Sequence, residues 1–316
     1  MNQPFFKSGV LAVFLCIAVP VGVSLFLIAP MNSYPRGSTV LISAGSTITE
    51  SAHTLEGLHI VRSATVFSLL VQITNGSGVI AGTYALKERE NAVSLAYRFS
   101  HGDTGITLVR VTIPEGVTTS EMGDILLKSL GSFDIEKFKE LAKKQEGYLF
   151  PETYFFLPNI SPEEVIAIMR HEFDEKIKPL QEKITTFGRP LGEVVTMASI
   201  LEKEARQADT RKIVAGILWK RISLSMPLQV DAVFGYILGK SGYAPTLSDL
   251  KIASPYNTYL HTGLPPGPIG NPGLEALEDA VSPTKNPFLY YLTDKEGNIY
   301  YAKTFAEHVA NKNKLR

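Results

Sequence analysis

Two stretches of the chain, VLISAGSTITESAHTL at residues 40–55 and VTIPEGVTTSEMGDIL at residues 111–126, follow one pattern at a constant offset of 71 positions. In each, alternating apolar residues lead to a glycine, a threonine, and a glutamate three positions after the threonine. The matched residues are Val40, Ile42, Gly45, Thr47, Glu50 and Leu55, and Val111, Ile113, Gly116, Thr118, Glu121 and Leu126. Apolar alternation predicts a strand, and Thr-x-x-Glu is the capping box that begins a helix. The pattern therefore predicts two strand–turn–helix units, related by internal duplication or simply two ordinary units of this kind.

The surrounding sequence extends the first unit into a small α+β region at residues 37–105. Residues 63–72 and 91–99 have helical patterns, and residues 82–86 read as a returning strand, which gives a βααβ unit followed by a helix. Further helices are expected at residues 133–144, 162–180 and 192–206, and a hairpin at residues 288–302. A length of 316 residues, at roughly 150 residues per domain, suggests two folded units. The fold class is thus α+β, with a second, mixed α+β domain at residues 106–316.

The amino-terminal region contains an uncharged apolar run, GVLAVFLCIAVPVGVSLFLIA, at residues 9–29. About 20 apolar residues suffice to cross a bilayer as a helix, so the run predicts a single transmembrane helix, in which Pro20 is tolerated as a kink. The alternative is a cleaved signal peptide, whose apolar region is usually shorter. Lys7 precedes the run, so residues 1–8 are expected in the cytoplasm and the rest of the chain outside.

Composition excludes several classes of function. The 31 Lys and Arg residues balance the 31 Asp and Glu residues, which argues against a nucleic-acid partner bound by a basic surface. The single cysteine, Cys16, excludes a disulfide framework and a cysteine-based zinc site. The six histidines include no HExxH spacing, so no metal and no cofactor is expected.

The first candidate for chemistry is the helical stretch that contains ASILEKEA at residues 198–205. On a helical wheel, Met197 and Leu201 belong to an apolar stripe that also includes Glu204, whereas Glu202 lies outside it. A carboxyl among apolar side chains has a raised pKa, which suits a general acid near neutral pH. The alternative is a solvated Glu-Lys-Glu at the end of an amphipathic helix.

Three further segments carry candidate substrate-binding residues. In EGYLFPETY at residues 146–154, aromatic rings and acids alternate in a way that suits a sugar site, although a core-packed turn has the same composition. The other two segments are LQVD at residues 228–231 and the Pro/Gly-rich stretch at residues 255–272, which is typical of a groove-lining loop or a linker. The candidate residues are Glu146, Tyr148, Glu152, Gln229, Asp231, Tyr256 and Asn257. We expect these segments to meet the Glu202–Glu204 helix in one cleft.

Taken together, ASILEKE, EGYLFPETY, LQVD, SPYNTYLHTGLPPGPIGNPG and PFLYYL resemble the endolytic murein transglycosylases of the MltG, or YceG-like, family. The resemblance implies one transmembrane helix, a LysM-like subdomain at residues 37–105 and a catalytic domain facing the cell wall. It also places the catalytic glutamate in the Glu-Lys-Glu motif, with Glu204 the first choice and Glu202 the second. The chain has Asp231-Ala232-Val233 where the family usually has Asp-Pro-Thr.

The implied reaction is non-hydrolytic cleavage of the β-1,4 bond between N-acetylmuramic acid and N-acetylglucosamine, with a 1,6-anhydro product end. The implied biological role is the termination or trimming of nascent strands. The expected partners are peptidoglycan strands, the inner (plasma) membrane crossed by one helix, and, as a further candidate, peptidoglycan synthases. Two alternatives stay open: a lysozyme-like hydrolase and a non-catalytic, membrane-tethered glycan-binding scaffold.

Overall fold

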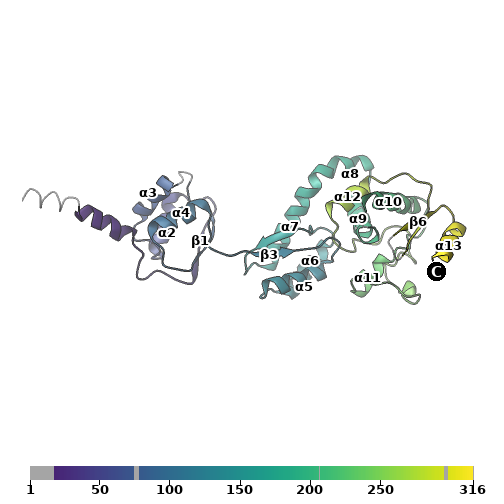
Figure 1. Ribbon diagram of the computed structural model, residues 1–316, viewed down its shortest axis with the longest axis horizontal. Helices are drawn as coiled ribbons and strands as arrows, with labels where there is room; N and C mark the ends of the chain where they lie inside the picture. Colours follow the sequence, from purple (N-terminus) through teal and green to yellow (C-terminus); the bar gives the residue numbers. More distant parts are fainter. Residues whose placement is uncertain (1–17, 75–77, 206, 295–297, 316) are drawn as a thin grey trace, which may run out of the picture. The chain divides into compact units, whose positions relative to one another are not determined.

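The computed structural model describes residues 18–74, 78–205, 207–294 and 298–315 (Figure 1). The chain forms two compact units, Met1–Thr107 and Leu108–Arg316, each of mixed α+β structure. Residues 18–28 are helical, but none of the helices in the described part of the chain is both long and apolar enough to cross a bilayer. Residues 9–17 of the expected anchor lie outside the described residues.

Unit 1 contains the expected βααβ arrangement and a following helix. Its strands pair antiparallel, with Val40 opposite Tyr84. In the core, the ring of Tyr84 stacks on Phe99 with 4.0 Å between the centroids, and Leu55 and Phe67 are fully buried. The elements are β1 (Ser38–Ile42), α2 (Ile48–Gly57), α3 (Ala64–Thr74), β2 (Gly82–Leu86) and α4 (Ala92–His101).

Unit 2 begins with the same five elements in the same order. Its first two strands also pair antiparallel, with Val111 opposite Tyr154. The elements are β3 (Val109–Thr112), α5 (Thr119–Leu130), α6 (Ile135–Ala142), β4 (Thr153–Phe156) and α7 (Pro162–Ile177), with the 3₁₀ turn η1 (Lys143–Gln145) after α6. We call residues 38–101 the first module and residues 109–177 the second module.

The two modules agree in detail as well as in topology. Both predicted capping boxes are present, with the Thr47 side chain accepting from Glu50 N–H and the Thr118 side chain accepting from Glu121 N–H. Both modules contain a buried tyrosine whose hydroxyl donates to the carbonyl four residues earlier, at 2.7 Å: Tyr84 to Ile80 and Tyr154 to Phe150.

The two residues that accept from these tyrosines, Ile80 and Phe150, also make equivalent backbone hydrogen bonds. The Ile80 N–H donates to Phe99 O, and the Phe150 N–H donates to Met169 O. Elements β1, α2, α3 and β2 begin at residues 38, 48, 64 and 82, and β3, α5, α6 and β4 at residues 109, 119, 135 and 153. These four starts differ by 71 positions, whereas the matching hydrogen bonds and the starts of α4 and α7 differ by 70, so the second module is one residue shorter before the tyrosine of β4. The near-constant offset and the matching hydrogen bonds support internal duplication.

The rest of unit 2 packs around one central helix, α9 (Leu191–Glu204), in which residues 194–201 are all buried. Helix α9 contacts α10 (Ala208–Ser223), α11 (Ala232–Leu238) and α12 (Leu274–Val281), and Figure 1 shows α10 and α12 beside it. The predicted hairpin is present as β5 (Tyr290–Thr293) and β6 (Ile299–Ala302). The remaining elements are α8 (Gln181–Phe187), α13 (Phe305–Lys314) and the 3₁₀ turns η2 (Lys178–Leu180) and η3 (Asp249–Lys251).

One predicted helix is wrong in extent. The helix expected at residues 162–180 ends at Ile177, and the chain tightens into the 3₁₀ turn η2, which contains Pro179. Proline has no N–H to donate and disfavours the helical conformation of the residue before it, so the helical hydrogen bonding cannot continue unchanged.

Candidate active site

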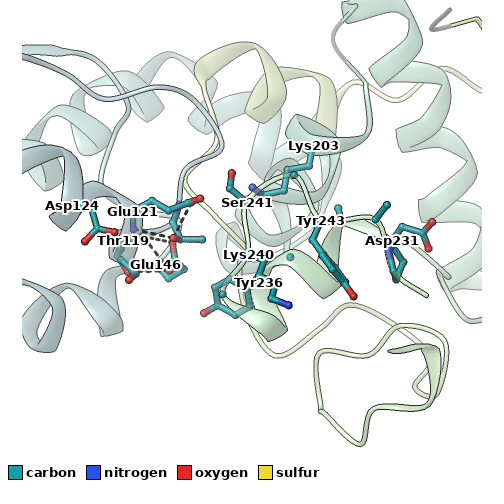
Figure 2. A pocket seen from close by; sticks show the side chains of 18 of the residues that line it. Thr119, Glu121, Asp124, Glu146, Lys203, Asp231, Tyr236, Lys240, Ser241 and Tyr243 are labelled. Atoms are coloured by element: carbon teal, nitrogen blue, oxygen red, sulfur yellow. Dashed lines mark hydrogen bonds between the residues drawn. The ribbon is translucent and has the colours of Figure 1, made fainter. Parts of the chain in front are cut away.

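Unit 2 contains a cavity of about 780 Å³ between the second module and the end of α9. One wall is formed by the start of α5 together with Lys139, Lys143 and Glu146. The other wall is formed by Lys203 and Glu204, the start of α11 and the loop at residues 239–245. Figure 2 shows Thr119 and Glu146 on one side of this cavity, Asp231 on the other, and Tyr236 between them.

Glu204 is the last residue of α9, and its half-buried side chain lines the cavity. The hydroxyl of Tyr291 on β5 donates a 2.8 Å hydrogen bond to Glu204 Oε2. Burial raises the pKa of Glu204 to about 7, and the nearby Asp231 charge adds to the increase, whereas the Tyr291 hydroxyl and the Ala232 N–H oppose it. Because this pKa is close to neutrality, the carboxyl can both give and take a proton there.

Glu202, the second choice for the acid, does not line this cavity. Its Oε2 accepts a 2.9 Å hydrogen bond from the Gly273 N–H, at the start of α12. The side chain therefore links the end of α9 to α12.

Asp231 immediately precedes α11 and has an exposed side chain. Its Oδ1 accepts a 2.6 Å hydrogen bond from the hydroxyl of Tyr259. Two carboxyl groups, Glu204 and Asp231, thus line the same cavity, and each accepts a hydrogen bond from a tyrosine of a distant segment.

Glu146 lies at the other wall and is tightly held. Its carboxylate accepts hydrogen bonds from the Thr119 N–H at 3.1 Å and the Thr119 hydroxyl at 3.0 Å, and from the Asn271 side-chain amide at 3.0 Å. Burial raises the pKa of Glu146 to about 7, and these hydrogen bonds counteract part of the increase. An acceptor at the first N–H groups of α5 satisfies donors that the helix itself cannot.

Tyr148 and Tyr256 line a smaller neighbouring hollow of about 380 Å³, which shares Glu146 and Tyr236 with the larger cavity. Pro268 also lines this hollow. Gly147 packs so closely against this proline that a Cβ would lie 2.4 Å from Pro268 Cγ. The predicted meeting of the residue 146–154 segment with the Pro/Gly-rich loop is therefore observed.

Three predicted substrate-binding residues lie elsewhere. Glu152 lines a separate hollow of about 440 Å³ beside Glu115 and Glu275. Gln229 is exposed and lines none of the three cavities described here, and its N–H donates to Thr258 O.

Asn257 is fully buried, and its side-chain amide donates to Leu250 O and Ile252 O. It therefore holds the loop in shape from within.

Four residues with a clear place in the site were not among the sequence candidates: Thr119, Tyr236, Tyr259 and Tyr291. The signal for Tyr291 was present in the FLYYLT strand pattern, in which alternation turns Tyr290 and Tyr291 to opposite faces. Nothing in the sequence, however, indicates which of the two faces meets α9.

Comparison with known proteins identifies the family. The model of the YceG-like family matches residues 40–314, which is most of the chain. The chain belongs to the YceG-like family.

Relatives and a solved structure agree with the family assignment. The chain is 31% identical to a Streptococcus pneumoniae protein named endolytic murein transglycosylase, over 86% of this chain and 57% of that protein. It is 30% identical to the Bacillus subtilis protein of the same name, over 86% of this chain and 83% of that protein. A crystal structure of a yceG-like protein from Listeria monocytogenes is 32% identical, with a TM-score of 0.61, and the match covers 88% of this chain and 99% of that one. The chain thus spans little more than half of the pneumococcal relative.

Proposed function

We propose that this YceG-like chain is an endolytic lytic transglycosylase that cleaves the β-1,4 bond between N-acetylmuramic acid and N-acetylglucosamine in peptidoglycan. The observation that carries the proposal is the Glu204 carboxyl on the wall of a 780 Å³ cavity, with its pKa raised to about 7 by burial. The names of the pneumococcal and Bacillus relatives support the same class of reaction.

In the proposed mechanism Glu204 is the acid and then the base. The protonated carboxyl donates its proton to the glycosidic oxygen as the bond to C1 of N-acetylmuramic acid breaks. The resulting carboxylate takes the proton of the C6 hydroxyl of the same sugar, whose oxygen closes onto C1 and gives the 1,6-anhydro end. A hydroxyl on the same ring has a high effective concentration, so no activated water is needed.

The proposed substrate contacts are those that the cavities bring together. Asp231 lies beside Glu204, and Glu146 lies across the same cavity. Tyr148 and Tyr256 offer aromatic faces for sugar rings in the adjoining hollow. Glu152, Gln229 and Asn257 are outside this proposed substrate site, because two lie away from the cavity and the third is committed to its own loop.

The test is digestion of purified glycan strands, followed by mass measurement of the fragments. We expect anhydro ends from the wild type, a loss of at least about 100-fold in Glu204→Gln, and near-normal cleavage in Glu202→Gln, provided that both variants stay folded. Reducing ends would instead favour a lysozyme-like hydrolase with Asp231 as its second carboxylate. Binding without cleavage by the wild type would favour the glycan-binding scaffold.

We also propose that residues 9–29 anchor the protein in the inner (plasma) membrane, with the catalytic unit outside the cytoplasm. In the described part of this run, at least half of the residue surface is exposed at four apolar residues, as expected of side chains that face lipid: Val19, Val21, Leu25 and Phe26. We expect the mature protein to begin near Met1 and to sediment with membranes. A soluble native form that begins after Ala29 would contradict the anchor.

Residues 37–105, within unit 1, are proposed to be the LysM-like accessory subdomain that places glycan strands without supplying a catalytic side chain. Its βααβ order supports this assignment. Peptidoglycan synthases remain a proposed partner, and termination or trimming of nascent strands a proposed role.

A further inference from the structure

The Glu204 carboxyl is held by a side chain from a part of the chain that is remote in sequence. Tyr291 lies 87 residues away from Glu204, and its hydroxyl meets Oε2 at 2.8 Å. Strand β5, which carries Tyr291, is fixed by its antiparallel pairing with β6, where Tyr301 lies opposite Tyr291. The Arg221 side chain of α10 anchors the strand as well, because its Nε donates to Leu289 O at 2.7 Å.

We infer that Tyr291 is a positioning residue for the proposed reaction: its hydroxyl holds Glu204 Oε2 as an acceptor, which leaves the other carboxyl oxygen to carry the proton that moves to the glycosidic oxygen. This inference rests on the proposed function of Glu204. The carbonyl oxygen of a carboxylic acid accepts hydrogen bonds better than its hydroxyl oxygen does, so a fixed donor at Oε2 favours the acid proton on the other oxygen. The arrangement therefore selects a single reactive face of an otherwise rotatable group.

Tyr291 is suited to this role because it remains a donor. The burial of its ring and the nearby Glu204 carboxyl both raise the pKa of Tyr291 well above its usual value. The hydroxyl thus keeps its proton throughout the pH range in which Glu204 titrates, and it stabilises the carboxylate that forms after proton donation. The same hydrogen bond lowers the pKa of Glu204 relative to burial alone.

Other groups around Glu204 both raise and lower its pKa. Asp231 raises its pKa through charge, and the Ala232 N–H lowers it. Lys203 lines the same cavity, and Arg221 and Tyr259 lie near Tyr291 and Asp231. All of these groups remain when the Tyr291 hydroxyl alone is removed, so Tyr291→Phe isolates one contact.

The experiment compares Tyr291→Phe with Tyr290→Phe, the same change one residue earlier on the same strand. The contact between residue 290 and the Arg221 guanidinium is made by the face of the ring, so it is retained whether residue 290 is Tyr or Phe. For Tyr291→Phe we expect kcat to fall about tenfold with little change in KM, because the reacting oxygen is no longer fixed. The alkaline limb of the kcat profile should move upward by about one pH unit, since the carboxylate has lost a donor. Tyr290→Phe should change neither.

A direct titration separates failure of this inference from failure of the proposed function. Carboxyl ¹³C resonances of the wild type and Tyr291→Phe, assigned with Glu204→Gln, report the Glu204 titration without any turnover. An upward shift in Tyr291→Phe supports the positioning contact even if Glu204 proves not to be the acid. Loss of kcat with an unmoved alkaline limb and an unmoved titration would overturn the inference, because it would reduce Tyr291 to a packing residue. Circular dichroism of both variants checks that the fold is retained.

Discussion

The two modules share their elements and differ in what their loops do. In the first module, the Thr47–Glu50 capping box is exposed and Gly45 has open space around its α-carbon. In the second module, the equivalent turn is bonded to the rest of unit 2: the Gly116 N–H donates to Asn271 O at 2.7 Å, and the Asn271 N–H donates to Val117 O at 2.9 Å. Among the described residues, the backbone of this turn therefore bonds to a distant segment in the second copy and to neighbouring residues in the first.

The buried Asn271 amide is the centre of this bonding. It donates to Val117 O and to Glu146, and its oxygen accepts from the Leu149 N–H. One side chain thus joins two segments of the second module, at Val117 and at Glu146–Leu149, to the Pro/Gly-rich loop. The comparison shows that a small module can be recruited as the wall of a cavity through changes in two loops, while its helices and strands keep their packing.

The largest expected effect comes from matched core truncations. Phe67 and Phe138 are fully buried at equivalent positions of α3 and α6. Each change to Ala should cost about 3–5 kcal/mol of the stability of its own unit. Phe138→Ala should abolish glycan cleavage, because the second module forms a cavity wall, whereas Phe67→Ala should retain most cleavage of soluble strands. Thermal unfolding measures the loss of stability, and the release of glycan fragments measures cleavage. An equal loss of cleavage in both variants would contradict the proposed difference in role between the two modules.

The second largest effect is on how the free energy of unfolding changes with pH, which is expected to have opposite signs for Glu146 in the second module and Glu50 in the first. Burial raises the pKa of Glu146 to about 7 from an ordinary value of 4.5, so between these values the folded protein holds a proton that the unfolded chain has released. Stability should therefore fall as pH rises through that window, by up to about 3 kcal/mol for this one group. Glu146→Gln should reduce that slope in urea titrations from pH 4.5 to 7.5, and the Glu204 carboxyl, whose pKa is also raised to about 7, should account for part of the slope that remains.

In the first module, hydrogen bonds from Thr47 lower the pKa of Glu50, so its contribution is present above pH 4.5 and lost as pH falls. Glu50→Gln should leave the change of stability with pH between 4.5 and 7 as it is in the wild type. It should remove only the loss of stability that protonation of Glu50 causes below pH 4.5. The same slope between pH 4.5 and 7 in the wild type and Glu146→Gln would contradict the assignment.

A smaller effect separates the two turn glycines. Gly45 and Gly116 have φ values of +81° and +76°, which an L side chain adopts only with strain. Gly45→Ala should cost about 1 kcal/mol, since its Cβ would meet nothing within 4 Å. Gly116→Ala should cost about 2 kcal/mol, because its Cβ would lie 3.2 Å from Glu202 Cγ. Equal costs in denaturant unfolding would show that the second turn is no more constrained than the first.

The smallest effect is expected at the caps. Thr47→Ala and Thr118→Ala each remove an N-cap and should each cost about 1 kcal/mol. Only Thr118→Ala should also slow cleavage, by a few-fold, since the start of α5 lines the cavity. Unaltered kinetics in Thr118→Ala would mean that this wall does not contact substrate.

The sequence predicted local structure better than it predicted which residues meet. The capped helices and the hairpin follow from patterns within about a dozen residues, and the structure contains them. Helix α10 was not predicted, because Arg211 and Arg221 are buried on it and interrupt the apolar stripe that marks a helix. Arg211 is accommodated by Asp279, at 2.7 Å, in a helix that lies far along the chain.

The candidate site shows the same division. The helical wheel separated Glu204 from Glu202, because a few residues of one helix decide which face each occupies. Asn257 was chosen for the composition of its loop, yet its amide is used by Leu250 O and Ile252 O. Composition cannot tell a side chain that waits for a ligand from one that binds its own backbone.

Asn271 also makes the proposed site depend on segments that are synthesised long after the second module. Its partners Val117 and Glu146 are 154 and 125 residues earlier in the chain, and Tyr291 follows it by only 20 positions. During synthesis the second module can form early from local contacts, but the cavity beside it is incomplete until the segments that carry Asn271 and Tyr291 have emerged. A chain that stops before these segments is thus a folded module without the proposed site.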